Sequence, residues 1–442
     1  MNKTATKTKS VFRSRRTKTG ENRDGFATAI DRLRAIPLPV VDPDLQGMQT
    51  SKRKMLPQHQ SGSKKTFADQ STSWGGGVVA AFALYSPCAR LPAARRVELT
   101  SHRTFQSTAT PRLGEDPKLA SEIIDLRRFG SREIKPLLDT ESREWDSKLH
   151  WNYASAARLI SSGVEEKRLS GYALLTAGRI SGYSFFFYED AKGLLGNLYV
   201  QPGESRLESA QTLLEHVLET LLATPGLGRV ETQLPHFSLD DLGGQFGSQG
   251  FSAFLRRFMA VPLPGPPAHP ADTDPGKAEK REVLKDVEIV PWERRHDPQA
   301  ARLLFEVYRN HVDAKINDHY KSLEGSTRLV ENIVRHWGCG ESLPGASLVG
   351  VHRPTQKIAA ILAMTAVRAW TAHIPQIAVA PEFQGLGLGT AMMELSFRRL
   401  AKQGYKEVTL TVTDRNSDAV RLYERMGFET FKTFGAFVWE RT

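Results

Sequence analysis

The interpretation of this 442-residue chain starts from Val379-Ala380-Pro381-Glu382-Phe383-Gln384-Gly385-Leu386-Gly387-Leu388-Gly389-Thr390. The apolar run Ile377-Ala378-Val379 leads into this stretch and predicts a strand, and a helical pattern follows it. Glycines allow positive φ angles and a close approach of the backbone to a ligand. Backbone N–H groups that converge at the start of a helix form a site for phosphate or pyrophosphate. The stretch therefore predicts that the chain binds a phosphorylated cofactor.

Two other phosphate-binding loops are excluded by the residues of the turn. A P-loop requires Gly-Lys-Ser or Gly-Lys-Thr, whereas Gly389 is followed by Thr390 and Ala391. A dinucleotide-binding turn has a third glycine where Thr390 stands, and it opens a βαβαβ unit. Only 53 residues follow Gly389, which is too few for such a unit.

Strands and helices are predicted to alternate around the turn. A hairpin is expected at Arg353-Pro354-Thr355, and Asn416 is expected to cap a last helix that ends at Gly427. The helix after the turn carries an apolar face and should end at Gly404. The remaining pattern predicts a helix over 298–312 and strands over 287–291, 347–352, 358–367 and 408–413.

Two motifs in this order resemble the GCN5-related N-acetyltransferase (GNAT) superfamily, whose members use acetyl-CoA. The first is Gln384-x-x-Gly387-x-Gly389, between strand and helix. The second is Asn416-x-x-Ala419-x-x-Leu422-Tyr423-x-x-x-Gly427-Phe428, after the next strand. The resemblance covers residues 287–442. It implies an enzyme that transfers acetyl from acetyl-CoA to a primary amine by direct attack in a ternary complex.

The resemblance also implies roles for individual residues. Backbone N–H groups of Gln384, Gly385, Leu386, Gly387, Leu388, Gly389 and Thr390 should hold the CoA pyrophosphate. The backbone of Ile377, Ala378 and Val379 should pair with the pantetheine arm and polarise the thioester carbonyl. Asn416 should bond to the same arm, although a helix cap alone explains an Asn there. Tyr423 should protonate the departing thiolate, although its apolar helix face also suits a core residue.

The general base is less clearly marked. Related enzymes often carry a Glu about eleven residues before the motif's Gln, and His373 stands at that position here. Histidine titrates near neutral pH, so His373 is the predicted base. Pro375 interrupts the strand pattern and could shift its register. Glu382 is the second candidate, within the turn.

A second, altered copy precedes the first at a spacing of about 178 residues. Leu198-Tyr199-Val200-Gln201-Pro202 parallels Ile377 to Pro381, and Phe246-x-x-x-Gly250-Phe251 parallels the end of the second motif. The glycine turn is replaced by residues 206–211, and Phe246 has no proton to donate. The predicted fold is α/β, with two tandem GNAT domains, each a twisted mixed sheet flanked by helices. Residues 118–263 form the silent copy, 264–286 a Pro-rich linker and 287–442 the active domain.

Composition places limits on partners and compartment. Residues 1–117 hold 20 Lys and Arg against nine Asp and Glu, which accounts for the net charge of +11. This tail is predicted to be disordered, and the neutral remainder does not suggest nucleic-acid binding. Cys88 and Cys339 form neither a disulfide framework nor a metal motif, which favours a reducing, cytoplasmic location. No membrane span is expected.

The sequence does not distinguish a small-molecule amine from a peptide amine as the acceptor. It does not indicate the oligomeric state. Acetyl-CoA is the expected cofactor, and no metal is expected. A narrower alternative is the acetylation of a small thiol such as mycothiol. A third alternative is a module that binds CoA without catalysis. It remains open because His373 stands where related enzymes often carry a Glu.

Overall fold

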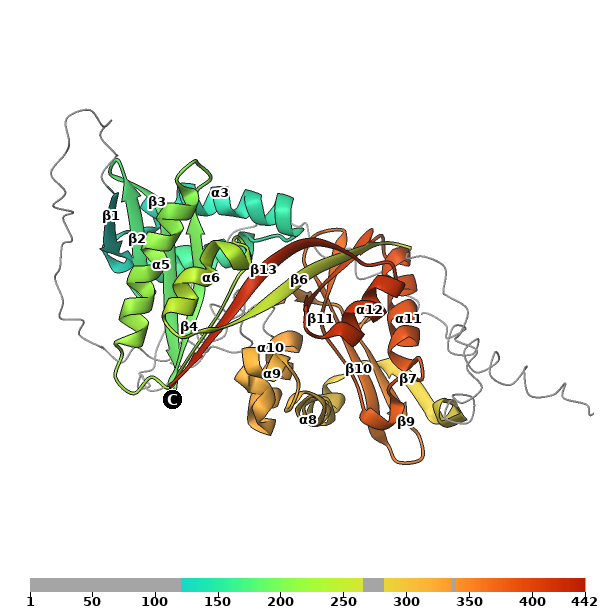
Figure 1. Ribbon diagram of the computed structural model, residues 1–442. Coiled ribbons are helices and arrows are strands. Elements are labelled where there is room, and N and C mark those ends of the chain that lie inside the picture. Colours follow the sequence, from blue (N-terminus) through green and yellow to red (C-terminus); the bar gives the residue numbers. More distant parts are fainter. Residues whose placement is uncertain (1–120, 265–281, 336–338, 442) are drawn as a thin grey trace, which may run out of the picture.

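The computed structural model in Figure 1 describes residues 121–264, 282–335 and 339–441. The predicted tail over 1–117, Cys88 and most of the predicted linker over 264–286 lie outside these described residues. The end of that linker forms the 3₁₀ turn Glu282–Asp286. In the described ranges, every helix is too short or too polar to cross a bilayer.

The N-terminal half, residues 121–262, begins with strand β1 and two helices and continues with alternating strands and helices. Its α5 helix begins at Arg206, within the stretch that replaces the glycine turn. The strands are β1 (Ser121–Asp125), β2 (Ser170–Thr176), β3 (Arg179–Glu189), β4 (Lys192–Val200), β5 (Arg229–Leu234) and β6 (Ser252–Pro262). The helices are α3 (Ser131–Leu149), α4 (Ala154–Glu165), α5 (Arg206–Leu222) and α6 (Leu239–Ser248).

The C-terminal half, residues 282–441, follows the order predicted from its sequence. The hairpin at Arg353-Pro354-Thr355 and the helices on either side of β12 are confirmed. Its strands are β7 (Val287–Pro291), β8 (Glu341–Ser342), β9 (Leu348–His352), β10 (Lys357–Ala366), β11 (Thr371–Val379), β12 (Glu407–Thr413) and β13 (Glu429–Glu440). Its helices are α8 (Asp297–Tyr308), α9 (Asp313–Ile316), α10 (Leu323–Arg335), α11 (Leu388–Lys402) and α12 (Ser417–Arg425).

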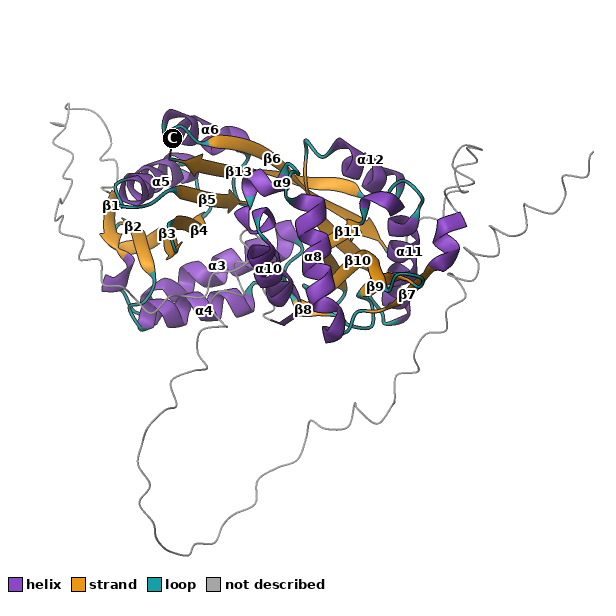
Figure 2. Cartoon of the chain, turned by 90° about the horizontal axis from the view of Figure 1, so that it is seen from below, coloured by secondary structure: helices purple, strands orange, loops and turns teal. Residues whose placement is uncertain are grey.

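All described strands join one mixed sheet of 13 strands. The order is β1-β2-β3-β4-β5-β13-β6-β12-β11-β10-β9-β7, and β8 pairs with β10. Figures 1 and 2 show α8, α9 and α10 on one side of β10 and β11, with α11 and α12 on the other. The two halves thus form a tandem α/β architecture with one continuous sheet.

The halves exchange their last strands. The N-terminal strand β6 pairs with β12, from Pro262↔Glu407 to Arg256↔Thr413, and the C-terminal strand β13 pairs with β5. The strands β6 and β13 also pair with each other at the centre of the sheet. Their side chains follow the exchange, since Phe437 is buried in the N-terminal core and Met259 in the C-terminal core. Burial of large apolar side chains therefore couples each half to the other.

In the N-terminal half, Arg206 begins the stretch that corresponds to the glycine turn, and Phe246 stands at the position of Tyr423. Phe246 is fully buried and stacks on Phe437 with ring centroids 3.9 Å apart. Arg206 begins α5 and binds both carboxylate oxygens of Glu144, at 3.1 and 2.8 Å. The buried Glu141 accepts hydrogen bonds from neighbouring strands. These contacts show that Phe246 and Arg206 are held by packing and by an ion pair, and the silence of this copy stays a prediction.

Candidate active site

A gap in the sheet opens between β11 and β12. These strands are parallel neighbours only from Thr371↔Glu407 to Ile374↔Leu410. Pro375 follows, and it has no N–H group to continue the pairing. The strand nevertheless runs through Pro375 to Val379, with a register irregularity against β10 between Ala363 and Thr365. The proline therefore ends the pairing with β12 without ending the strand.

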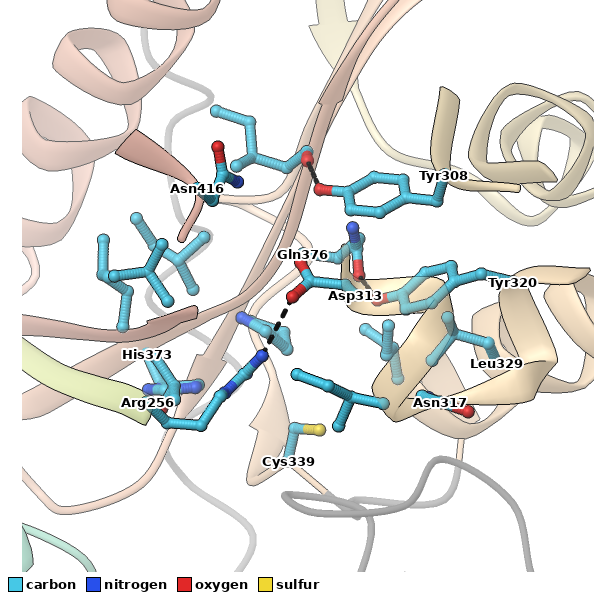
Figure 3. A pocket seen from close by; sticks show the side chains of 18 of the residues that line it. Arg256, Tyr308, Asp313, Asn317, Tyr320, Leu329, Cys339, His373, Gln376 and Asn416 are labelled. Carbon is cyan, nitrogen blue, oxygen red and sulfur yellow. Dashed lines mark hydrogen bonds and ion pairs between the residues drawn. The ribbon is translucent and has the colours of Figure 1, made fainter. Parts of the chain in front are cut away.

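A pocket lies at this gap (Figure 3), and both halves of the chain line it. The predicted residues His373, Ile377, Asn416 and Tyr423 are brought together there. The α8–α10 side contributes residues that the sequence did not single out: Tyr308, Asp313, Ile316, Asn317, Tyr320, Leu329 and Ile333. The N-terminal half contributes Gln233 and Arg256. Within the described ranges, no three His, Cys, Asp or Glu side chains gather as metal ligands.

Tyr423 lies on α12 with its side chain in the pocket wall. It is 7% exposed and packs edge-on against Phe428, at 5.6 Å between ring centroids. Burial, followed by the nearby charge of Asp313, raises the pKa of the Tyr423 phenol above its ordinary value. The phenol is therefore protonated at neutral pH. Tyr423 therefore both belongs to the C-terminal core and lines the pocket.

Asn416 is the N-cap of α12. Its side-chain oxygen accepts a hydrogen bond from the Ala419 N–H group at 3.4 Å. The residue also lines the pocket, so the cap holds the amide at the gap between the strands. The amide nitrogen of an asparagine can donate two further hydrogen bonds.

The backbone of β11 presents alternate residues to the gap. The Tyr308 hydroxyl donates to the carbonyl of Ile377, and the Gln384 side chain donates to the carbonyl of Val379, both at 2.8 Å. Ala378 lies between them, opposite Ile361 of β10, and is 4% exposed. Because the N–H and C=O of one strand residue point to the same side, Ile377 and Val379 also direct N–H groups toward the gap.

The glycine turn joins β11 to α11. Gly385 and Gly387 have φ angles of 70° and 93°, in the region where a side chain is strained. Leu386 and Leu388 are buried, so their side chains anchor the turn. The helix begins at Leu388, and its first turn, which holds Gly389 and Thr390, leaves backbone N–H groups without intrahelical partners. After β11 and the glycine turn, the chain thus presents a helix start whose first N–H groups have no intrahelical partners.

His373 lines the pocket from β11 but is enclosed by other side chains. Its Nδ1 lies 3.0 Å from the Thr409 hydroxyl, and its ring packs edge-on against Trp151 at 5.2 Å. Burial lowers the pKa of His373 to about 3. A base with that pKa holds a proton poorly at neutral pH, so this environment does not favour the predicted role. Glu382 is exposed in the 3₁₀ turn Pro381–Phe383 and does not line the pocket.

Asp313 and Arg256 form an ion pair in the pocket that the sequence did not reveal. Arg256 Nη1 lies 3.1 Å from Asp313 Oδ1, and Thr413 also donates to that oxygen. Burial raises the pKa of Asp313, but a hydrogen bond from His311 and the charge of Arg256 outweigh burial, so the net shift is downward. A carboxylate and a guanidinium therefore face the pocket in their charged forms.

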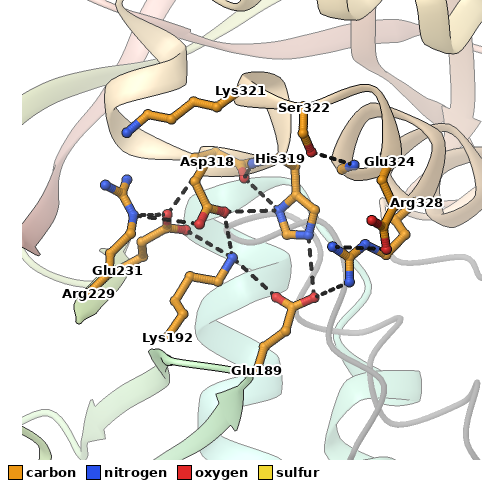
Figure 4. A network of polar contacts seen from close by, with 12 residues as sticks. Glu189, Lys192, Arg229, Glu231, Asp318, His319, Lys321, Ser322, Glu324 and Arg328 are labelled. Carbon is orange, nitrogen blue, oxygen red and sulfur yellow. Dashed lines mark hydrogen bonds and ion pairs between the residues drawn. The ribbon is translucent and has the colours of Figure 1, made fainter. Parts of the chain in front are cut away.

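An ionic network holds the α9–α10 segment against the N-terminal half (Figure 4). The buried Lys192 of β4 lies 2.6 Å from Asp318 and 3.1 Å from Glu189. His319 and Arg328 approach the same Glu189, each at 3.5 Å. The acidic partners outweigh burial and raise the pKa of Lys192, so Lys192 stays charged at neutral pH. This contact fixes the wall of the pocket that carries Tyr320.

Comparisons with known proteins agree with this geometry. Residues 317–428 match the sequence model of the Acetyltransferase (GNAT) family. The mycothiol acetyltransferase of Streptomyces scabiei is 44% identical over 57 residues, which are 13% of this chain and 18% of that protein. An N-alpha-acetyltransferase of Sulfurisphaera tokodaii is 39% identical over 62 residues, 14% of this chain and 36% of that protein. The matches thus span about a third or less of these relatives.

Two solved structures are similar to the chain at low sequence identity. A tandem GNAT protein from the clavulanic acid biosynthesis pathway has a TM-score of 0.48 and 15% identity, with 73% of this chain and 98% of that chain covered. A GCN5-related N-acetyltransferase from Sphaerobacter thermophilus has a TM-score of 0.47 and 15% identity, with 73% and 95% covered. The stretch over 317–428, which includes the glycine turn, Asn416 and Tyr423, is therefore the part of the chain that matches the acetyltransferase (GNAT) family.

Proposed function

We propose that the chain is an N-acetyltransferase that transfers acetyl from acetyl-CoA to a primary amine in the pocket of its C-terminal half. One observation carries the proposal: Ile377 of β11 and Tyr423 line the same pocket, and β11 continues into the glycine turn, where Gly385 and Gly387 have positive φ angles. Phosphate, an extended amide-bearing arm and a thiolate are the three parts of CoA that these groups suit.

In the proposed complex, the N–H groups at the start of α11 bind the pyrophosphate. The arm lies along β11, where Ile377 and Val379 pair with it and Asn416 donates from the opposite side. The acetyl carbonyl is then held where β11 and β12 separate, beside Ile374 and Tyr423. Backbone N–H groups there stabilise the negative charge that develops on the carbonyl oxygen.

In the proposed reaction, the amine nitrogen attacks the acetyl carbon. A C–N bond forms, the C–S bond breaks, one proton leaves the nitrogen and one reaches the sulfur. The protonated Tyr423 supplies the sulfur's proton. Asp313, whose pKa is lowered, and His373, with a pKa of about 3, both hold a proton poorly at neutral pH, so the amine's proton passes to solvent, and the charge of Asp313 serves to position the amine.

Titration calorimetry of the full chain with acetyl-CoA tests the proposal, followed by an assay of CoA release with a panel of amines. One acetyl-CoA site per chain is expected, because residues 206–211 replace the glycine turn in the N-terminal copy. Gly387→Ala should weaken binding, since a non-glycine residue in the left-handed region costs about 1–2 kcal/mol. Gly404→Ala is the matched control, because Gly404 has a φ of 89° but lies beyond α11, outside the turn.

Absence of acetyl-CoA binding would refute the proposal. Equal loss of affinity in both glycine variants would remove the turn from the cofactor site. Binding without CoA release for any amine would favour the non-catalytic CoA-binding module. The match to mycothiol acetyltransferase supports a small-molecule amine as the first acceptor class to screen, and the N-alpha-acetyltransferase match supports peptides as the second.

A further inference from the structure

Arg256 brings a cation from the N-terminal half into the pocket of the C-terminal half. It lies on β6, the exchanged strand, directly opposite Thr413 of β12. Its Nη1 donates to Asp313 at 3.1 Å and to the Thr413 hydroxyl at 2.6 Å. The side chain is only 13% exposed. Of the described residues that line the pocket, Arg256 is the one with a permanent positive charge.

Within the described part of the chain, the Nε side of this guanidinium lacks a hydrogen-bond partner. Nε of Arg256 is buried, and no acceptor for it exists among the described residues. Nε and Nη2 form the side of a guanidinium that binds a carboxylate through two parallel hydrogen bonds. Asp313 and Thr413 occupy Nη1 and leave this second edge unused.

Buried donors without partners are uncommon in folded proteins, because the lost contact with water is not replaced. The other polar side chains of the pocket do not satisfy this donor, although neutral amides and phenols surround it. A ligand group with two acceptor oxygens would complete the site. Asp313 bears the pocket's negative charge and stands beside the guanidinium, where it suits an ammonium group. The pair thus presents one charge of each sign to the bound molecule (Figure 3).

We propose that the acceptor is an amine that also bears a carboxylate, and that the free edge of Arg256 binds this carboxylate. The proposal rests on the proposed acetyltransferase function and names its substrate class: amino acids and short peptides with a free carboxylate near the amine. The acetylated nitrogen is the one that Asp313 faces. Arg256 is then a residue that sets specificity, and the N-terminal half takes part in substrate recognition although it lacks its own catalytic groups.

Pairs of acceptors that differ only in the carboxylate test this inference on the wild-type full chain. The proteinogenic L-amino acids and a set of dipeptides are compared with their C-terminal amides, with CoA release as the readout. Higher kcat/KM for the acids, through lower KM, is the expected result. The amides keep the amine and lose the negative charge, so the comparison does not depend on any variant's folding.

Arg256→Lys and Arg256→Met are then compared with Arg257→Met. Arg257 is the next residue of the same strand, binds Asp414 at 2.7 Å and does not line the pocket. Both Arg256 variants should raise KM for the acids by about 10- to 100-fold, the range for lost hydrogen bonds to a charged group. KM for the amides should rise by a smaller factor, because the amides offer Arg256 no carboxylate and are affected only through its ion pair with Asp313. Arg257→Met should leave the preference for acids unchanged.

The possible results distinguish a failure of the carboxylate site from a failure of the proposed acetyltransferase function. Equal use of acids and amides, or an equal effect of Arg256→Lys on both, would overturn the carboxylate site while leaving the acetyltransferase intact. Acetyl-CoA binding without acetylation of any carboxylate-bearing amine would overturn it as well. Absence of acetyl-CoA binding would instead refute the proposed function, as seen by calorimetry before any acceptor is added.

Discussion

Replacement of Phe437 by alanine tests whether the two halves unfold as one unit. Phe437 belongs to β13, the last strand of the C-terminal half, but its ring is fully buried in the N-terminal core. There it stacks on Phe246 at 3.9 Å between ring centroids. A loss of this ring therefore removes contacts that only the strand exchange creates.

The packing around the ring sets the expected magnitude. A Cβ atom at Gly435 would lie 2.4 Å from the Phe437 ring, so the ring fills its space closely. Phe→Ala substitutions in cores cost about 3–5 kcal/mol, more where the cavity cannot collapse. The stacked pair adds to this value through ring contacts. We expect the free energy of unfolding to fall by about 4 kcal/mol, which raises the population of the open state about a thousand-fold.

Hydrogen exchange followed by mass spectrometry measures this effect separately in each half. In Phe437→Ala, the amides of β4 and of β12 should both exchange faster and by similar factors. Phe397→Ala is the matched control, because Phe397 is buried in the C-terminal core alone. If the sheet unfolds as one unit, this variant should also speed exchange in β4.

Two results would refute this reasoning. The first is faster exchange in β4 of Phe437→Ala while β12 keeps its protection. The second is two separate transitions for the wild type in guanidinium chloride, recorded by circular dichroism and by tryptophan fluorescence. Either result would mean that the halves are independent despite the shared sheet.

Two further predictions concern the catalytic groups. Tyr423→Phe should lower kcat by about 10²–10⁴-fold, the usual contribution of an acid catalyst, with acetyl-CoA affinity unchanged by calorimetry; an unchanged kcat would remove Tyr423 from the reaction. His373→Asn should leave the pH profile of kcat/KM without a shift near pH 6.5, because a pKa of about 3 places His373 outside that range. The same buried histidine binds fewer protons folded than unfolded, so it lowers the stability as pH falls below 6.5. His373→Asn should therefore weaken the decline of the unfolding free energy between pH 6.5 and pH 4, measured with urea. A loss of activity near neutral pH in this variant would instead support His373 as the base.

The sequence predicted the local parts of the site well. The positive φ angles of Gly385 and Gly387, the cap at Asn416 and the helix that carries Tyr423 all follow from neighbouring residues. Short-range sterics and hydrogen bonds decide such features, so a motif of a few residues is sufficient to find them.

The parts that could not be predicted depend on distant residues. Arg256 meets Asp313 only because β6 joins the other half's sheet, and nothing in the adjacent residues signals that pairing. The low pKa of His373 likewise arises from burial beside Trp151, which lies more than 200 residues away in the sequence. The sequence marks Phe246 as the counterpart of Tyr423, but nothing near it indicates Phe437, on which it stacks.

The strand exchange also sets an order of events during synthesis. Chains emerge from the ribosome N-terminus first, and domains generally fold in that order. The strand β6 is complete at Pro262, yet both of its neighbours, β12 and β13, are made at least 145 residues later. Until then β5 and β6 present unpaired edges, which are prone to pairing with other chains. A nascent N-terminal half should therefore need a chaperone's protection, and synthesis of β13 should be the step that releases it.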